Sequence, residues 1–378
     1  MAGLPLSGLT VVELGHSIAA PYAGLILAEL GADVIKVERT GEGDPVRDWG
    51  PPFRDGVAMA FVTYNRGKAS IAVDFRVPEQ RDRLRDLIVE RADIVLQNLK
   101  ASAADKAGLG SATLMERKPS LIYCNVHAFG AVGPLKESPG YDPLMQAFGG
   151  LMSVTGAADG ALPVRVGVSI IDMGAGMWAV IGILAALAEL KRGGRGSVVD
   201  VSLFETAIGW MMWPLSSYFA SGDVPQRQGS GMSGIVPYQV FLTQDSCLMI
   251  AAGNDNLFKR LCVAIDRPEW IQDPRFSTNG IRVRNREVLV PLLEAVFAAR
   301  STAEWNALLS QAGVPAAPLQ DTAAVAANAQ TAALAIIQTQ PGSNFPSVAL
   351  PISFNGLRPP VKGPAPRLGQ DTERILRK

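Results

Sequence analysis

Histidine and cysteine are both scarce in this chain, which has two histidines and three cysteines among 378 residues. Cys124, Cys247 and Cys262 are isolated and mostly in apolar surroundings, so we expect small core residues rather than disulfides or metal ligands. With only His16 and His127 present, a zinc site is not expected. A catalytic triad would need one of these two side chains.

The chain also lacks an excess of either charge, because 35 basic residues balance 35 acidic ones. With no net positive charge, the chain is not expected to bind nucleic acid or an anionic membrane through its overall charge. Any phosphate group must be bound by a few basic residues at one site. Residues 1–7 lack the basic start and long apolar core of a secretory signal, which predicts a cytoplasmic protein. An apolar content of 48% is sufficient for one large domain and a smaller one.

The first forty residues alternate as strand 10–14, helix from about 21 to 30 and strand 33–37, which is a βαβ unit. The loop 15–21 lacks the glycines that let a pyrophosphate approach the backbone, so NAD or FAD binding is not expected. The alternation continues in a helix over 78–91 and strands over 94–96, 121–126 and 198–201. This pattern predicts an α/β fold with a largely parallel, doubly wound sheet.

The composition changes at residues 221–236 to Gly, Ser, Pro and Gln, which predicts a linker or a mobile loop. A second, α+β domain is expected beyond it, with a hairpin turning near 244–246, a helix over about 256–264 and a helix after the capping box 301–304. The alanine-rich segment 322–335 leads out of this domain. The proline-rich segment 357–366 predicts an extended tail on the surface.

Asp172 stands alone in an apolar stretch, where a carboxylate must be protonated, paired, held by backbone N–H groups or kept for chemistry. The apolar run 173–190 after it predicts a buried helix. A membrane span is the alternative, but the run barely reaches the necessary length and is broken by Glu189. At the start of such a helix the dipole can keep Asp172 ionised, so an N-cap and an active-site carboxylate are both open interpretations.

Basic residues recur in loops after the early strands: Arg39, Arg47, Arg66, Lys68, Lys100 and Lys106. Since ligands of doubly wound sheets bind at the C-terminal strand ends, these residues could line a site for a long polyphosphorylated cofactor. Solvated surface charge is the alternative for each of them. His16 and His127 also follow strands and could face the same crevice or simply be hydrogen-bonded there.

Several strings of residues resemble the class III CoA-transferases of the CaiB/BaiF type. They are Ala28–Glu38, Asn65–Lys68, Gly140–Asp142, Asp172 with its glycine-bearing helix, and Gly196–Ser202. The similarity extends nearly end to end. Segment 234–241, Gly253-Asn254 and segment 282–286 look most similar to the succinate–hydroxymethylglutarate, or dicarboxylate, branch.

The resemblance implies a large Rossmann-like domain made from residues 1–220 and 331–378, and a small α+β domain from 221–330. It also implies a homodimer in which two chains interlock as linked rings. The implied activity is transfer of CoA from an acyl-CoA donor, here succinyl-CoA, to a carboxylic and specifically dicarboxylic acid. The CoA thioester would be a substrate, with no permanently bound cofactor and no metal.

Asp172 matches the family's catalytic aspartate, which forms a mixed anhydride and then an aspartyl-CoA thioester. The loop 229–234, with Gly231 and Gly234, matches a glycine-rich loop that covers the thioester against water. Tyr141 and Asp142 belong to the matching turn, although a local Asx hydrogen bond would also explain Asp142. The CoA-binding residues by resemblance are Arg39, Asn65, Arg66, Lys68, Asn98 and Lys106, to which position after a strand adds Arg47, His16 and His127.

The chain departs from the family pattern at Gln97–Lys100, where an acid-Asn-aromatic-Arg string is usual. Ser230, Met232 and Ser233 interrupt the glycine loop. Ile18 stands where the formyl-CoA branch has glutamine, so a formyl or oxalyl substrate is not expected.

Arg165, seven residues before Asp172, could pair with the distal carboxylate of a dicarboxylic acyl group or form a surface salt bridge. The rival function within the family is a 2-methylacyl-CoA racemase, which pairs a histidine with the later aspartate. Tyr141 stands nearest to that histidine here and is a poor base at neutral pH. A non-catalytic CoA-binding protein is the rival from another class.

Overall fold

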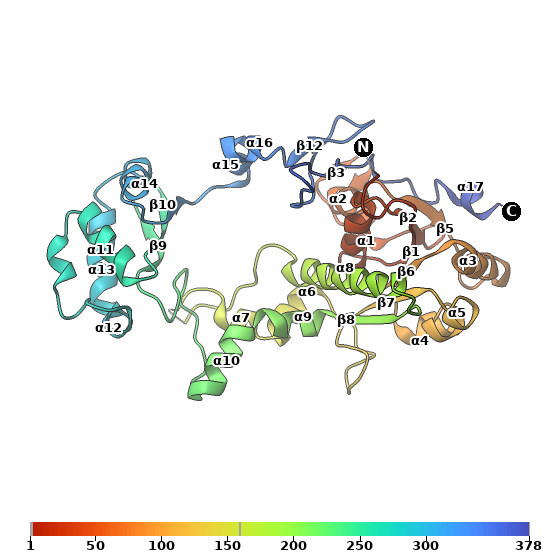
Figure 1. The fold of residues 1–378 in the computed structure, drawn as a ribbon, viewed down its shortest axis with the longest axis horizontal. Coiled ribbons are helices and arrows are strands. Elements are labelled where there is room, and N and C mark those ends of the chain that lie inside the picture. Colours follow the sequence, from red (N-terminus) through yellow and green to blue (C-terminus); the bar gives the residue numbers. More distant parts are fainter. Residues whose placement is uncertain (1–2, 159, 378) are drawn as a thin grey trace. The chain divides into compact units, whose positions relative to one another are not determined.

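The computed structural model describes residues 3–158 and 160–377, which divide into two compact units (Figure 1). The large unit holds the described residues up to 151, residues 165–223 and those from 330 on. The small unit holds the described residues of 152–164 and residues 224–329. Relative to the boundaries expected from the sequence, segment 152–164 joins the small unit rather than the large one.

The large unit is built on a six-stranded parallel sheet in the order β5-β2-β1-β6-β7-β8. The strands are β1 (Thr10–Leu14), β2 (Asp33–Glu38), β5 (Ala69–Ala72), β6 (Ile94–Gln97), β7 (Ile122–His127) and β8 (Val198–Ser202). The predicted α/β class and parallel sheet are confirmed, and the predicted strand ends lie within one residue of the observed ones.

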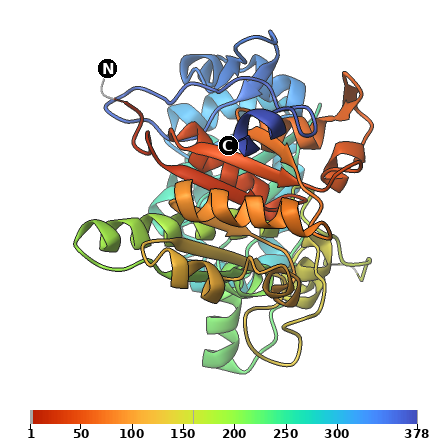
Figure 2. The same cartoon turned by 90° about the vertical axis from the view of Figure 1, so that its right-hand side faces the viewer.

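Helices cover both faces of this sheet. The helices of the large unit are α1 (Ala19–Glu29), α2 (Met59–Asn65), α3 (Pro78–Arg91), α4 (Ala101–Lys106), α5 (Ser111–Arg117), α6 (Asp142–Phe148), α8 (Ile170–Lys191), α9 (Leu203–Trp210) and α10 (Met212–Ser221), of which α1, α3 and α8 lie nearest the sheet. Helix α8 lies beside α1 and against β7 and β8 (Figure 1), whereas Figure 2 shows α3 in front of the strands on the other face.

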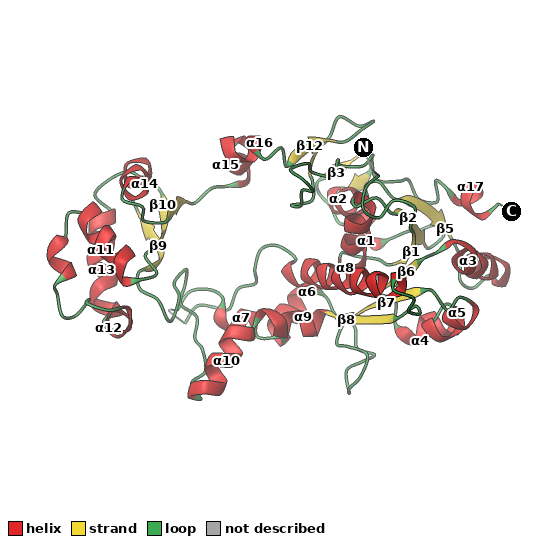
Figure 3. Ribbon diagram, in the orientation of Figure 1, coloured by secondary structure: helices red, strands yellow, loops and turns green. Residues whose placement is uncertain are grey.

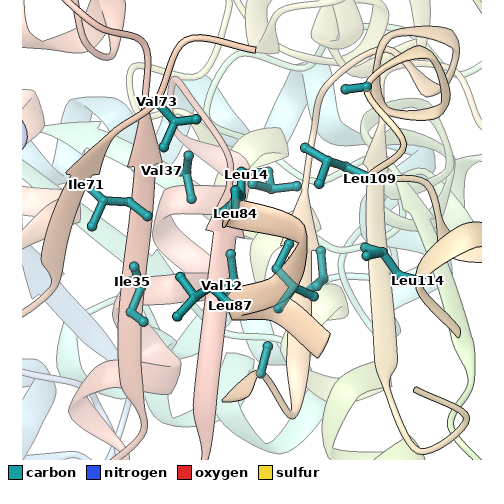
Figure 4. Close-up of a cluster of buried hydrophobic side chains, with 14 of the residues drawn as sticks. Val12, Leu14, Ile35, Val37, Ile71, Val73, Leu84, Leu87, Leu109 and Leu114 are labelled. Atoms are coloured by element: carbon teal, nitrogen blue, oxygen red, sulfur yellow. The ribbon is translucent and has the colours of Figure 1, made fainter. Parts of the chain in front are cut away.

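One core cluster forms where alternate strand residues meet α3 and the α5 region (Figure 4). Side chains two apart on a strand point to the same face, so Val12 and Leu14 of β1 and Ile35 and Val37 of β2 pack together. Leu84 of α3 covers them and is fully buried. This packing holds the carboxyl ends of the strands, where ligands of such sheets bind, on a rigid base.

Helix α8 was predicted to be buried, but the structure buries only one side of it. Ala175 and Ala179 are fully buried, while Met177, Trp178 and Ile181 are 46%, 46% and 53% exposed. By length and composition alone α8 could cross a membrane, yet its buried side packs against α1 and the sheet. In the single chain it is therefore a core helix with an uncovered apolar face.

The contact between α1 and α8 depends on Gly176. A Cβ at this position would lie 2.7 Å from the carbonyl oxygen of Ala19, a backbone atom that cannot move aside cheaply. We expect Gly176→Val to lower the free energy of unfolding by about 3 kcal/mol through overpacking, measured by urea denaturation. Gly209→Ala is the matched control, because a Cβ there meets nothing within 4 Å and should leave stability equal or slightly higher. Equal effects of both changes would show that the helices are not tightly packed at Gly176.

The small unit contains a three-stranded antiparallel sheet of β9 (Tyr238–Leu242), β10 (Cys247–Ala251) and β11 (Ala316–Pro318), with helices packed on it (Figure 3). Its helices are α11 (Asp255–Ala264), α12 (Asn279–Arg284), α13 (Arg286–Phe297), α14 (Thr302–Gln311) and α15 (Thr322–Ala327), with α7 (Leu151–Val154) at the border. The predicted hairpin and the capping box of Ser301 and Glu304 are confirmed.

Two predicted loop segments are more ordered than the sequence indicated. Segment 228–235 is held by bridges between Gly156 and Gly229 and between Met232 and Ile235. The tail 357–366 is extended as predicted, but it is not simply on the surface, because Val361 is buried. The remaining elements are β3 (Phe53–Arg54), β4 (Val57–Ala58), α16 (Ala329–Ala333), β12 (Ile337–Thr339), β13 (Pro346–Val348), α17 (Thr372–Leu376) and the short 3-10 helices Pro45–Asp48 and Pro268–Ile271.

Candidate active site

Asp172 is the third residue of α8 and is not its N-cap. The capping group is the carboxylate of Asp142, whose Oδ2 accepts the N–H groups of Ile171 at 2.7 Å and of Asp172 at 3.2 Å. Gln146 donates to the other oxygen of Asp142 at 2.6 Å. Asp142 therefore caps α8 from thirty residues away rather than forming a local Asx turn. The carboxylate of Asp172 does not cap the helix.

The Asp172 carboxylate is buried, with 9% of the residue exposed, and among the described residues no hydrogen bond or ion pair to it is formed. Burial, reinforced by the negative charge of Asp142, raises the pKa of Asp172 to about 7. The sequence had suggested a carboxylate kept ionised by the helix start. The structure instead gives a poorly solvated carboxylate with a raised pKa, which is a stronger nucleophile when ionised.

Asp172 lines a cavity of about 180 Å³ at the carboxyl ends of β1, β6 and β7. We name this the Asp172 cavity. Its lining includes His16, Ser17, Ala19, Asn98, Leu99, Lys100, Val126, His127, Ala128, Lys136, Glu137, Ser138, Pro139, Gly140, Tyr141, Asp172 and Leu203. His16 and His127, predicted to face the sheet edge, and Asn98 and Tyr141, assigned by the family resemblance, all line this cavity with Asp172.

The loop after β1 is held in place by two polar side chains. Asn98 accepts the N–H of His16 at 2.9 Å and donates to its carbonyl at 2.8 Å. Asp44 accepts the N–H of Ser17 at 3.1 Å, and Ser17 adopts a φ of 65°, which is unfavourable for a residue other than glycine. Burial lowers the pKa of His16, so its ring lines the cavity in the neutral form near pH 7.

A buried cluster of charges lies beneath that loop. Lys36 contacts Glu13 at 3.1 Å and Asp44 at 2.8 Å, and it donates to the carbonyl of Gly15 at 2.7 Å. Lys68 contacts the other oxygen of Glu13 at 2.7 Å, and burial lowers its pKa to about 8. Because Asp44 joins both Lys36 and the N–H of Ser17, the cluster connects the sheet to the site.

Four residues predicted to bind CoA have their polar groups engaged within the chain. Arg47 is paired with Glu38 at 2.7 Å, and Arg66 with Glu29 at 2.6 Å. Lys68 donates to Asn65 at 2.9 Å as well as to Glu13. Arg47, Asn65, Arg66 and Lys68 are all buried, and none lines either cavity described here. Their geometry supports a structural role in the chain rather than direct contact with a ligand.

A second cavity, of about 420 Å³, lies at the ends of β1, β2 and β5, and we name it the Arg39 cavity. It is lined by Leu14, Gly15, His16, Val37, Glu38, Arg39, Glu42, Gly43, Asp44, Pro45, Val73, Asp74, Phe75, Arg76 and Leu99. His16 and Leu99 also line the Asp172 cavity. The two cavities therefore adjoin, which makes room for one long ligand.

The other predicted site residues lie elsewhere. Lys106 is exposed at the end of α4, and Ile18 is buried ahead of α1, so neither lines a cavity. Arg165 donates to the carbonyls of Val166 at 3.1 Å and Gly167 at 3.3 Å and is exposed. Gly231 and Gly234 belong to the small unit.

The sequence did not single out several residues that the structure brings to the site. They are Asp44, which holds the loop after β1, Asp200, which contacts His127, and Lys136, Phe75 and Arg76, which line the two cavities. Phe75 and Arg76 follow β5, so the same rule of strand ends could have found them. Over residues 3–158 and 160–377, no group of three His, Cys, Asp or Glu side chains is arranged to hold a metal ion.

Comparisons with known proteins agree with this geometry. Residues 6–372 match the family described as CoA-transferase family III. The chain is 34% identical to succinyl-CoA:glutarate CoA-transferase of Mus musculus, over 99% of this chain and 86% of that protein. It is 36% identical to succinate--glutarate CoA-transferase of Agrobacterium fabrum, over 98% of this chain and 95% of that protein. A crystal structure of a CAIB/BAIF family protein from Brucella suis is similar with a TM-score of 0.88 and 39% identity, covering 99% and 98% of the two chains.

Proposed function

Because this chain belongs to CoA-transferase family III, we propose that it transfers CoA from succinyl-CoA to a dicarboxylic acid. The observation that carries the proposal is Asp172, a buried carboxylate without a hydrogen-bond partner among the described residues, in a cavity at the sheet edge. Relatives over 30% identical along nearly the whole chain are named for succinyl and glutarate substrates, which supports the choice of acids.

The proposed reaction proceeds through the Asp172 carboxylate. Its oxygen attacks the thioester carbonyl, so that a mixed anhydride forms and CoA thiolate leaves. The thiolate then attacks the aspartyl carbonyl, which gives an aspartyl-CoA thioester and releases succinate. The acceptor carboxylate attacks that thioester, and the freed thiolate attacks the acceptor carbonyl of the new anhydride, which regenerates Asp172 and yields the product thioester. Every step exchanges one acyl bond for another, so no proton or redox partner is needed.

The two adjoining cavities suit the two ends of CoA. The Arg39 cavity offers the apolar side chains of Val37 and Phe75 for a base and the cations of Arg39 and Arg76 for phosphates. The Asp172 cavity would receive the thioester. Accordingly we assign CoA contact to Arg39, His16 and the Asn98 segment, and not to the buried Arg47, Asn65, Arg66 and Lys68.

We further propose the interlocked homodimer that the family resemblance implies. Exposed apolar residues support it: Met177, Trp178 and Ile181 of α8, and Met212, Trp213 and Phe219 of α10, which are 71%, 59% and 76% exposed. Large apolar side chains left exposed on two helices are typical of an interface. The three cysteines are free thiols, as suits a reducing cytoplasm.

The glycine loop, residues 229–234, is proposed to cover the aspartyl thioester against water. Arg286 anchors it by donating to the carbonyls of Met232 at 2.5 Å and Ser233 at 2.9 Å. Burial lowers the pKa of Arg286, consistent with a guanidinium held under the loop.

Releasing this anchor is expected to expose the intermediate. We expect Arg286→Gln to raise the ratio of acyl-CoA hydrolysis to CoA transfer by about threefold to tenfold, measured by thiol release without and with acceptor acid. Arg284→Gln is the matched control, since Arg284 is exposed two residues earlier on the adjoining helix α12. An unchanged ratio in Arg286→Gln would contradict the covering role of the loop.

A second candidate function is a 2-methylacyl-CoA racemase, because His127 lines the same cavity as Asp172 and the two could serve as opposed bases. Among the described side chains none forms a hydrogen bond to the carboxylate of Asp172, which favours Asp172 as the nucleophile of CoA transfer over Asp172 as a base of a racemase.

Isotope exchange separates these functions. The protein is incubated with succinyl-CoA and labelled succinate, and in parallel with a 2-methylacyl-CoA in deuterated water, and both are followed by mass spectrometry. Label entering succinyl-CoA supports CoA transfer. Deuterium at the α-carbon without label transfer would instead mean a racemase, and neither signal would mean another donor or a CoA-binding protein.

A further inference from the structure

Polar side chains form a continuous chain across three neighbouring strands beside the Asp172 cavity. Gln97 of β6 donates to Asn125 of β7 at 2.5 Å, and Asn125 donates to Asp200 of β8 at 2.8 Å. The three residues are partners in the sheet register, so their side chains leave the same face at the same level. This series of hydrogen bonds ends at His127, whose Nε2 lies 3.0 Å from Oδ1 of Asp200.

This chain of hydrogen bonds sets the orientation of the His127 ring. A carboxylate can only accept, so the His127 Nε2 carries the hydrogen that Asp200 receives. Among the described residues no hydrogen bond to Nδ1 of His127 is formed, and the side chain is 11% exposed while lining the Asp172 cavity. Since a carboxylate can only accept, a second carboxylate at Nδ1 can be bound only by the imidazolium form of the ring, in which both nitrogens donate.

The other basic groups around the cavity are less suited to recognise a second carboxylate. Lys100 and Lys136 are exposed, so their charges are solvated. His16 has a pKa lowered by burial, and its Nδ1 is 3.0 Å from the hydroxyl of Ser17. Arg165 donates to backbone carbonyls and does not line the cavity.

We propose that His127, oriented by Asp200, binds the distal carboxylate of the dicarboxylic acyl group while Asp172 reacts at the proximal one. This inference rests on the proposed CoA transfer and names the substrate-binding residue that selects diacids. His127 is the specificity-determining residue, and Asp200 is a positioning residue that acts through it. Both act on the binding of the acid and not on the bonds that change.

The test compares acceptor acids in variants of the full-length protein, with succinyl-CoA as donor. We expect His127→Gln to raise the KM for glutarate by about 10- to 100-fold, as for loss of a hydrogen bond to a charged group, with kcat within about threefold of the parent. Asp200→Asn keeps a hydrogen-bond acceptor for the ring without the charge, and a smaller rise in the same direction is expected. The KM for valerate, which has the same chain length and no distal carboxylate, should stay within about twofold.

Two comparison variants make the test specific. Arg165→Ala and Lys259→Met, the latter at an exposed position on α11 outside both cavities, should leave the KM for glutarate near that of the parent. The inference is overturned if either comparison variant, and not His127→Gln, raises this KM, or if His127→Gln affects glutarate and valerate equally. It is also overturned if kcat collapses in His127→Gln while KM holds, because His127 would then take part in the chemistry. Failure of the proposed CoA transfer would be recognised separately, because the parent protein itself would then exchange no label between succinate and succinyl-CoA.

Discussion

Asp172→Asn is expected to abolish CoA transfer, with a loss of at least about 10⁴-fold in kcat, because the amide cannot form the anhydride. The isosteric side chain leaves the cap from Asp142 to the N–H groups of α8 intact, so CoA binding should survive. Label exchange between succinate and succinyl-CoA measures the activity, and calorimetry with CoA measures binding. Asp223→Asn, at an exposed position, is the matched control. Substantial exchange by Asp172→Asn would remove this residue from the mechanism.

The raised pKa of Asp172 predicts two opposite pH effects. Activity needs the ionised carboxylate, so kcat/KM should fall about tenfold per pH unit below about 7. Stability goes the other way, because the folded protein keeps a proton that the unfolded chain has lost between its ordinary pKa of 3.8 and about 7. Stability is therefore lost as the pH rises through that window. At pH 8 Asp172→Asn should be more stable than the parent by up to about 4 kcal/mol in urea denaturation.

The same variant checks the cause of the shift. If burial raises the pKa of Asp172, the stabilisation by Asp172→Asn should vanish below about pH 3, where both states of the parent are protonated. A stability difference that does not depend on pH would contradict this account and point to packing instead.

Lys36→Met is expected to lower the free energy of unfolding by about 3–5 kcal/mol, because it leaves Asp44 as an uncompensated buried charge and Glu13 with Lys68 alone. Urea denaturation at pH 7 measures the loss. Arg117→Met is the matched control, since its pair with Asp86 is exposed and should contribute at most about 1 kcal/mol. Adding Asp44→Asn to Lys36→Met should restore part of the loss. No restoration, or equal losses in Lys36→Met and Arg117→Met, would show that the cluster is not a buried ionic network.

Much of the fold could be predicted because its signals are local. Alternation of apolar residues marked β1, β2 and β6 to within one residue, and the capping box at Ser301 marked the start of α14. Asp172 stood out for a related reason, since a lone carboxylate before an apolar run is visible in the chain itself. The rule that ligands bind at strand ends brought His16 and His127 to the correct edge, and the family resemblance brought Asn98 there.

The sequence could not show which charges are paired within the chain. Arg47 and Lys68 follow strands in the manner of phosphate ligands, yet they contact Glu38 and Glu13 in neighbouring parts of the sheet. A counter-ion nine or 55 residues away leaves no pattern around the basic residue, so only the fold reveals whether a cation is free. The cap of α8 by Asp142 was missed for the same reason.

By itself, then, the sequence determined the α/β class, the family and the importance of Asp172. The periodicity of apolar residues predicts the helices and strands, and short matching strings indicate the family. Only the tertiary structure decided that Asp142 caps α8, that Asp200 orients His127 and that one side of α8 is left uncovered. These features depend on burial and on contacts between residues far apart in the chain. Desolvation and long-range pairing set the pKa and the hydrogen bonds of a side chain, and both arise only when the chain is folded.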